Sequence, residues 1–253
     1  LKRDDRPLTG LRIISLEQYG AAPFGTMMLA DLGAEVIKVE NHAAGGEMGR
    51  HVVPYRDPDG DSLFYQSFSC NKRCVALNLH APGGRAVLER LVASADGLVN
   101  NLRGDLPSKL GIDYASLAPV NPKIVCVHLS AYGRDGPRAS WPGLDYVVQA
   151  EAGYMWMTGE PDSPPTRFGL SVVDYMAGQA AAIALLAGIA GAQRTGTGSD
   201  YDTSLYDVAM ANLSYPATWH LTEGFEPKRA PRSGHPTLVP SELYRTRDGW
   251  IFI

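Results

Sequence analysis

The chain has 253 residues, of which 45% are hydrophobic and 20% charged, a composition typical of a globular protein with a substantial core. Its formal net charge is −4, with acidic and basic residues interspersed, which argues against nucleic-acid binding and requires local Lys or Arg side chains for any anionic ligand. Three cysteines without a C-x-x-C pair indicate neither a disulfide framework nor a zinc site, and the first residues contain no apolar signal core. We therefore expect a cytoplasmic protein that needs no metal.

The first forty residues have the pattern of a strand–helix–strand unit. Residues 11–16 (L-R-I-I-S-L) are an apolar run after a glycine, which predicts a buried strand. The loop E-Q-Y-G-A-A-P-F-G leads into a helix that ends at Gly33, and residues 35–39 (E-V-I-K-V) form a second strand. Because two strands joined through a helix run in the same direction, the unit predicts a parallel sheet and an α/β fold.

A glycine after the first strand and an acidic residue after the second are also features of dinucleotide sites. Gly20 and Gly25 are the only glycines of that loop, however, and the G-x-G-x-x-G pattern is absent. A dehydrogenase is therefore a weak interpretation, whereas a nucleotide-like ligand at this strand end stays open.

The middle of the chain continues the alternation of strands and helices. A basic N-K-R turn precedes alternating Val75, Leu77 and Leu79, which predict a strand, and the turn is either solvated or a phosphate contact. An amphipathic helix is predicted over 82–93 and further strands over 97–100 and 124–129. His128, inside the last of these strands, is interpreted as a packed core residue. The loop after the strand at 97–100 offers polar side chains where open α/β sheets bind ligands: Asn100, Asn101, Arg103 and Lys109.

Residues 167–192 form the central segment of the predicted site. A short apolar run over 170–173 brings Asp174 to the start of a long Ala- and Gly-rich helix. An Asp at this place is ordinarily an N-cap, but it could also be a nucleophile or base held at a positive helix end in an apolar wall. The run is long enough to span a membrane, yet it is mostly Ala and Gly without flanking aromatic or basic belts, so we interpret it as a buried helix.

The last quarter of the chain predicts the end of one domain and the start of another. A strand over 201–203 and a helix over 204–211 precede a stretch from 216 to 240 that is rich in Pro, Gly and charge. We therefore predict a large domain over 1–212, a linker over 213–232 and the beginning of a small domain over 233–253. The final D-G-W-I-F-I has the pattern of a strand just beginning, which suggests that the sequence is a fragment.

Six segments, taken together in their order, resemble a known family. They are L-T-G-L-R-I-I-S-L with A-P-F-G-T-M-M-L-A-D-L-G-A-E-V-I-K-V-E, C-N-K-R-C-V-A-L-N-L, N-N-L-R-G-D-L-P-S-K-L-G-I, L-S-A-Y-G-R-D-G-P, G-L-D-Y-V-V-Q-A-E-A-G and R-T-G-T-G-S-D-Y-D-T-S-L. The chain is similar over essentially its whole length to the family III CoA-transferases, the CaiB/BaiF group that includes formyl-CoA transferase. The resemblance implies a Rossmann-like parallel sheet with flanking helices, in a dimer of interlocked ring-like chains.

The resemblance also implies a chemistry and a set of site residues. Members move coenzyme A from an acyl-CoA donor to a carboxylic acid through aspartyl anhydride and aspartyl-CoA thioester intermediates, with Asp174 at the position of the nucleophile. CoA contacts of the family fall on Tyr19, Gly20, Ala21, Leu77, His80, Asn101, Leu102, Arg103, Lys109 and Leu110. Arg103 and Lys109 suit anionic phosphates independently of the resemblance.

Two departures from the family bear on its alternatives. The four-glycine run of formyl-CoA transferase has only Gly234 as its counterpart, in R-S-G-H-P, so oxalate and formate are not the favoured acids. The racemases of the superfamily have a His directly before the Asp of a G-H-D segment, where this chain has Leu144 before Asp145 and so lacks one base for α-proton exchange. A racemase-like enzyme and a non-catalytic CoA-binding subunit remain alternatives, as do a homodimer and a heteromer of related subunits. The pattern does not rank candidate donor and acceptor acids.

Overall fold

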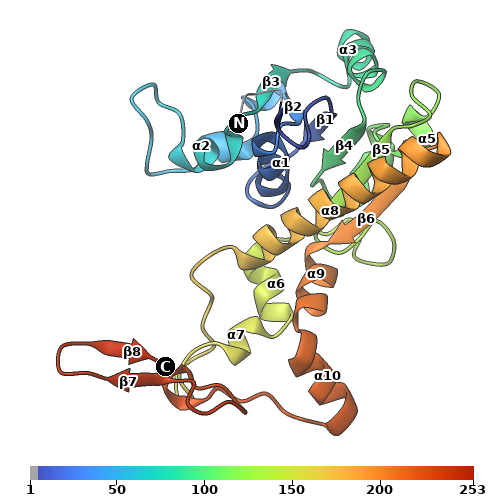
Figure 1. Ribbon diagram of the computed structural model, residues 1–253. Helices are drawn as coiled ribbons and strands as arrows, with labels where there is room; N and C mark the ends of the chain where they lie inside the picture. Colours follow the sequence, from blue (N-terminus) through green and yellow to red (C-terminus); the bar gives the residue numbers. More distant parts are fainter. Residues whose placement is uncertain (1–4) are drawn as a thin grey trace.

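A six-stranded parallel sheet organises the computed structural model, which describes residues 5–253 (Figure 1). Its strand order is β3-β2-β1-β4-β5-β6, the order typical of doubly wound dinucleotide-binding folds. The strands are β1 (Arg12–Leu16), β2 (Glu35–Glu40), β3 (Arg73–Ala76), β4 (Gly97–Asn100), β5 (Val125–Ser130) and β6 (Asp200–Ser204). A separate antiparallel hairpin near the C-terminus pairs β7 (Leu243–Arg245) with β8 (Trp250–Phe252).

Helices connect the strands and cover both faces of the sheet. The α-helices are α1 (Ala21–Asp31), α2 (Leu63–Ser69), α3 (Pro82–Val92), α4 (Leu106–Lys109), α5 (Tyr114–Leu117), α6 (Asp145–Glu151), α7 (Tyr154–Met157), α8 (Val172–Thr195), α9 (Leu205–Asn212) and α10 (Ser214–Glu223). Short 3-10 helices are η2 (His42–Ala44), η3 (Met48–His51) and η4 (Pro231–Ser233).

The alternation of side chains along each strand divides the core into two layers. Ile13 of β1 and Val99 of β4 pack with α1, α8 and α9, whereas the neighbouring Ile14 and Leu98 pack with α3 and α5 on the other face. Because both faces are covered, β4 and β5 are buried throughout, as expected for a central parallel strand. The predicted α/β fold, with a parallel sheet and flanking helices, is confirmed.

Several boundaries differ from the sequence-based predictions. β3 begins at Arg73, within the basic turn, and ends at Ala76, so the predicted strand around Leu77 and Leu79 is wrong in its position. α8 begins at Val172, two residues before Asp174. The predicted linker contains helix α10, and β8 is closed into a hairpin by β7. The division into a large domain, a linker and a small domain stays a prediction.

Helix α8 is the one helix within residues 5–253 that is long and apolar enough to cross a membrane. It lies along the sheet, where it contacts α1, β5 and α9 (Figure 1). Its buried residues recur at helical spacing along one side: Val173, Ala177, Gly178, Ala181, Leu185, Gly188, Ile189 and Ala192. This arrangement is that of a core helix packed closely through small side chains, which is the interpretation reached from the sequence.

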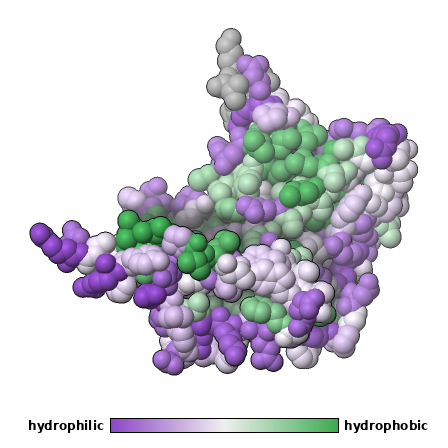
Figure 2. Space-filling model, turned by 60° about the horizontal axis from the view of Figure 1, so that its bottom comes forward, coloured by the Kyte–Doolittle hydropathy of each residue, from purple (hydrophilic) through white to green (hydrophobic). Residues whose placement is uncertain are grey.

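The surface keeps many large apolar side chains exposed, among them Trp156, Phe168, Leu170, Ile183 and Leu221. Figure 2 shows apolar areas separated by hydrophilic ones on the face that it presents. Exposed apolar areas of this kind are typical of surfaces that contact other protein chains.

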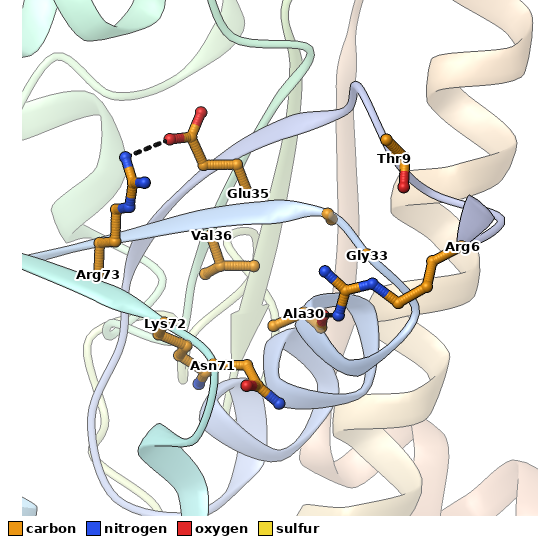
Figure 3. A pocket seen from close by; sticks show the side chains of 10 residues that line it. Arg6, Thr9, Ala30, Gly33, Glu35, Val36, Asn71, Lys72 and Arg73 are labelled. Carbon is orange, nitrogen blue, oxygen red and sulfur yellow. Dashed lines mark hydrogen bonds and ion pairs between the residues drawn. The ribbon is translucent and has the colours of Figure 1, made fainter. Parts of the chain in front are cut away.

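A cavity of about 600 Å³ lies at the amino-terminal edge of the sheet, where β2 and β3 begin (Figure 3). Two of its three basic side chains form ion pairs: Arg73 donates to Glu35 (2.8 Å) and Lys72 donates to the buried Glu17 (2.7 Å). The predicted site residues lie at the opposite, carboxyl-terminal edge.

Candidate active site

Asp174 lies in a small cavity at the carboxyl ends of the central strands. The cavity has a volume of about 110 Å³, and its lining comes from the segments that follow β1, β4, β5 and β6 together with the first turn of α8. Its lining residues are Gln18, Tyr19, Gly20, Ala21, Asn101, Leu129, Ser130, Ala131, Gly143, Leu144, Asp174 and Leu205. Four residues predicted to bind CoA thus lie around the predicted nucleophile: Tyr19, Gly20, Ala21 and Asn101.

The Asp174 carboxylate has an unusual electrostatic environment. Burial, together with the nearby negative charge of Asp145, raises its pKa from 3.8 to about 7. No group among residues 5–253 donates a hydrogen bond to this carboxylate that would offset these effects. Gly20 lies directly against it, because a Cβ at that position would be 2.9 Å from Asp174 Oδ2. A partly buried carboxylate with a raised pKa, open to a cavity, is available for covalent or acid–base chemistry.

Asp145 is the residue that caps helix α8. Its Oδ2 accepts the backbone N–H groups of Val173 (2.8 Å) and Asp174 (3.1 Å), while Gln149 Nε2 donates to its Oδ1 at 2.5 Å. Asp145 is 4% exposed, and burial raises the pKa of its carboxyl group in spite of these bonds. The N-cap role considered for Asp174 is therefore filled by a side chain from α6, and Asp174 is left free of it. Asp145 was not among the site residues predicted from the sequence.

A larger cavity adjoins the first. It has a volume of about 540 Å³ and lies beyond the carboxyl ends of β1, β2 and β3, and Gln18 borders both cavities. Its lining contains five residues predicted to contact CoA: Leu77, His80, Leu102, Lys109 and Leu110. The structure thus brings ten of the eleven predicted site residues to two neighbouring cavities, and Arg103 is the one that lines neither.

Arg103 and Lys109 nevertheless lie together, because both contact one carboxylate. Lys109 Nζ is 2.6 Å from Asp105 Oδ2, and Arg103 Nε is 3.3 Å from Asp105 Oδ1. The hydrogen bond from Lys109, followed by the charges of Arg103 and Lys109, lowers the pKa of Asp105. The two cations are therefore close enough to meet one group of phosphates, but Asp105 competes for them.

Asn101 has a structural task that the sequence did not reveal. Its Oδ1 accepts the N–H of Gln18 (2.8 Å) and its Nδ2 donates to the carbonyl oxygen of Gln18 (2.7 Å), so it ties the loop after β4 to the loop after β1. Tyr19, which follows Gln18 in the chain, has φ +58°. This left-handed conformation costs a residue other than Gly about 1–2 kcal/mol.

His128 is a packed core residue, as predicted, with 1% of its surface exposed. Its Nδ1 faces Asn100 Nδ2 (2.7 Å) and its Nε2 faces Asp200 Oδ1 (2.8 Å). Because an amide nitrogen only donates, the bond network assigns the imidazole proton to Nε2. Within residues 5–253 no group of three or more His, Cys, Asp or Glu side chains is placed to hold a metal ion.

Comparison with curated proteins and solved structures gives consistent matches over the chain. The chain is 37% identical over 251 residues to the succinate–glutarate CoA-transferase of Agrobacterium fabrum, and the aligned region covers 98% of this chain and 62% of that protein. It is 36% identical over 247 residues to the acetyl-CoA:oxalate CoA-transferase of Acetobacter aceti, with 96% and 61% covered. The chain therefore spans about three fifths of the length of these relatives.

The fold matches equally well. A CaiB/BaiF family protein from Brucella suis superposes with a TM-score of 0.90 at 32% identity, over 98% of this chain and 66% of that one. A hypothetical protein from Mycobacterium tuberculosis gives a TM-score of 0.82 at 31% identity, over 98% and 64%. The sequence model of CoA-transferase family III matches residues 8–253. This chain is a member of CoA-transferase family III.

Proposed function

We propose that the protein transfers coenzyme A from an acyl-CoA donor to a small carboxylic acid, with Asp174 as the nucleophile. The observation that carries the proposal is the partly buried Asp174 carboxylate, which has no hydrogen-bond donor among residues 5–253 and opens to a cavity beside the larger one. A carboxylate in this state has lost part of its stabilisation by water and is more nucleophilic than an exposed one.

The proposed first half-reaction begins when Asp174 attacks the thioester carbonyl of the donor. The carbon–sulfur bond breaks, so that an acyl–aspartyl anhydride and a CoA thiolate form. The thiolate then attacks the aspartyl carbonyl of the anhydride, the donor acid leaves as its carboxylate, and an aspartyl-CoA thioester remains. In the second half-reaction the carboxylate of the acceptor attacks the carbonyl carbon of this thioester, so that a second anhydride, between Asp174 and the acceptor, forms and the thiolate is released. The thiolate attacks the acceptor's acyl carbon, and Asp174 is regenerated as a carboxylate.

The larger cavity is proposed to hold the nucleotide part of CoA. Leu77, Leu102 and Leu110 offer apolar contacts for the adenine and the pantetheine arm, and Lys109 offers a charge for a phosphate. Contacts far from the reacting carbonyl supply binding energy that is used to orient the thioester against Asp174. The small size of the Asp174 cavity limits water, which would hydrolyse the anhydride.

The acids exchanged are proposed to be small carboxylic acids, in keeping with relatives that are named for succinate, glutarate and oxalate. The single glycine at Gly234 argues against oxalate and formate for this chain. Leu144, at the edge of the Asp174 cavity, offers no second base, which disfavours the racemase alternative. Assembly as a homodimer or as a heteromer of related subunits is supported by the exposed apolar side chains, and a cytoplasmic location is part of the proposal.

The covalent intermediate provides the direct test. Incubation with succinyl-CoA without an acceptor should leave a CoA thioester on the peptide that contains Asp174, detected by mass spectrometry, and Asp174→Asn should abolish it. A panel of acceptor acids with labelled succinyl-CoA and acetyl-CoA would then identify the products. A protein that binds CoA but never carries this adduct, with any partner subunit present, would instead be a non-catalytic CoA-binding subunit.

A further inference from the structure

A buried cluster of charged side chains lies beside the active-site loop, which we define as residues 17–20 between β1 and α1. Lys38 of β2 is 1% exposed, and its Nζ lies 3.2 Å from Oε1 of Glu47 and 4.0 Å from Oε1 of Glu40. Arg50 pairs with Glu40 at 2.7 Å. Two basic and two acidic groups thus balance, but burying them is costly, and an apolar cluster of the same shape is often as stable.

The other oxygen of Glu47 faces the active-site loop. Glu47 Oε2 accepts the backbone N–H of Tyr19 (3.1 Å) and that of Gly49 (2.8 Å). Tyr19 is the residue with φ +58°. Unfavourable backbone conformations persist only where the surrounding structure enforces them, and they concentrate at functional sites. Among residues 5–253, Glu47 supplies the side-chain acceptor for the Tyr19 N–H.

The conformation of Tyr19 determines where the following residue stands. Gly20 comes next, with its Cβ position 2.9 Å from Asp174 Oδ2, and helix α1 starts at Ala21. Lys38 Nζ lies 3.2 Å from the other oxygen of Glu47, Oε1, so that its charge compensates that of the buried carboxylate. A chain of contacts therefore runs from Lys38 through Glu47 and Tyr19 to the backbone that borders the Asp174 carboxylate.

We propose that Glu47, whose charge Lys38 compensates, is a positioning residue that keeps Tyr19 in its left-handed conformation and so fixes the active-site loop against Asp174. The inference rests on the proposed function, because the loop matters for transfer only if Asp174 reacts. Glu47 also borders the larger cavity. A contact with CoA there would change mainly the Michaelis constant, whereas loss of positioning would change mainly kcat.

The test compares Glu47→Ala with the wild-type full chain by hydrogen–deuterium exchange and by steady-state kinetics. Loss of the Glu47 acceptor should accelerate amide hydrogen exchange in a peptide over residues 17–22. This measurement requires neither bound CoA nor an active enzyme. Misplacement of the loop should lower kcat by roughly ten- to a hundredfold, while the Michaelis constant for acyl-CoA changes less than kcat does.

Two further variants separate positioning from loss of stability. Tyr65→Phe disturbs the same cluster, because the Tyr65 hydroxyl contacts Arg50 (2.6 Å) and Glu40 (3.0 Å) but not Glu47, and it should leave loop exchange and kcat unchanged. The double variant Lys38→Met/Glu47→Gln removes both charges but keeps an acceptor for the Tyr19 N–H. It should restore slow exchange of the loop and most of kcat. If Glu47→Ala does not fold, the double variant still tests whether an acceptor at position 47 is sufficient to hold the loop.

Wild-type exchange of the loop in Glu47→Ala, or an unchanged kcat, would overturn the inference. An equal loss of kcat in Tyr65→Phe would also overturn it, because general destabilisation would then explain the effect. A wild-type chain without the CoA adduct on Asp174 would refute the proposed function, while the exchange measurement would still decide whether Glu47 holds the loop.

Discussion

Asp145 and Asp174 are carboxylates at the same helix end, and their surroundings give them different tasks. Asp145 is surrounded by donors, since Val173, Asp174 and Gln149 all donate to it. Asp174 has burial and a neighbouring negative charge but no donor within residues 5–253. The sequence pattern left Asp174 as either a cap or a nucleophile, because the capping side chain comes from 29 residues away in the chain. Tertiary structure removes that ambiguity.

The raised pKa of Asp174 predicts that the ionised carboxylate, which the reaction needs, destabilises the folded protein. Because the folded-state pKa is about 7 and the unfolded value near 3.8, the folded state binds more protons between these pH values, and stability falls as pH rises through this window. Asp174→Asn removes this partly buried charge. We expect this variant to be more stable than the wild type at pH 8, by about 2–4 kcal/mol, with little difference at pH 4. Urea unfolding at both pH values measures this, and equal stabilities at pH 8 would contradict the raised pKa.

Gly20 is predicted to be required for transfer activity, because the Asp174 carboxylate leaves no space for a side chain at position 20. Its φ of −105° is open to any residue, so Gly20→Ala should fold. The new methyl group would lie 2.9 Å from Asp174 Oδ2, where it would crowd the carboxylate and the attacked carbonyl. Transfer should fall by roughly ten- to a hundredfold. Gly83→Ala is the control, since nothing lies within 4 Å of its Cβ position. A Gly20→Ala enzyme with wild-type kcat would show that the reaction takes place elsewhere.

At the scale of elements, helices α1 and α8 approach through glycines. A Cβ on Gly25 would lie 2.2 Å from the carbonyl oxygen of Gly178, and one on Gly178 would lie 2.2 Å from that of Ala21. This close crossing brings the start of α1 to the first turn of α8, which carries Asp174. The Ala- and Gly-rich composition of 175–192 therefore has a physical reason: larger side chains would separate the two helix ends that form the cavity.

Gly178→Ala should consequently damage both stability and activity. Backbone atoms cannot give way as a side-chain tip can, so we expect a loss of about 1–3 kcal/mol in the free energy of unfolding and lower transfer activity. Gly191→Ala lies on the same helix with nothing within 4 Å, and it should stabilise the protein by about 0.5–1 kcal/mol through helix propensity. Thermal or urea unfolding of the two variants is the measurement. Equal effects would contradict the close approach of the helices.

The elements that could be predicted are those with strong local patterns. The strands β1, β2, β4 and β5 are apolar runs between turn residues, and their alternation with helices indicates a parallel sheet. Helix α10 was missed because Pro216 was interpreted as a linker residue. It lies in the first turn of that helix, where proline is tolerated since no intrahelical N–H bond is lost there. Glu47 lies in an irregular stretch without periodicity, so its contact with Tyr19 could not be read from the sequence.

At the scale of the whole molecule, one edge of the sheet carries both cavities. The carboxyl ends of parallel strands share a side, and the loops after β1, β3 and β4 accordingly border the two cavities. The order of elements therefore predicted where the site residues meet. What it could not predict is the electrostatic detail, since Asp105 and its two cations form a group whose partners depend on side-chain conformation.

Asp105 and its two cations, Arg103 and Lys109, either bind the CoA phosphates or form a structural unit on the surface. The direction in which Asp105→Asn changes CoA affinity distinguishes these two roles. If Lys109 meets a CoA phosphate, Lys109→Ala should raise the Michaelis constant for several acyl-CoAs alike by roughly tenfold, as expected for one charge-assisted contact. Arg103→Ala should raise it less, because Arg103 does not line the larger cavity. Asp105→Asn frees both cations from a competing carboxylate and should therefore tighten CoA binding, measured by calorimetry with free CoA. If Asp105→Asn instead weakens binding as Lys109→Ala does, the three residues form a surface structural unit and the phosphates lie elsewhere.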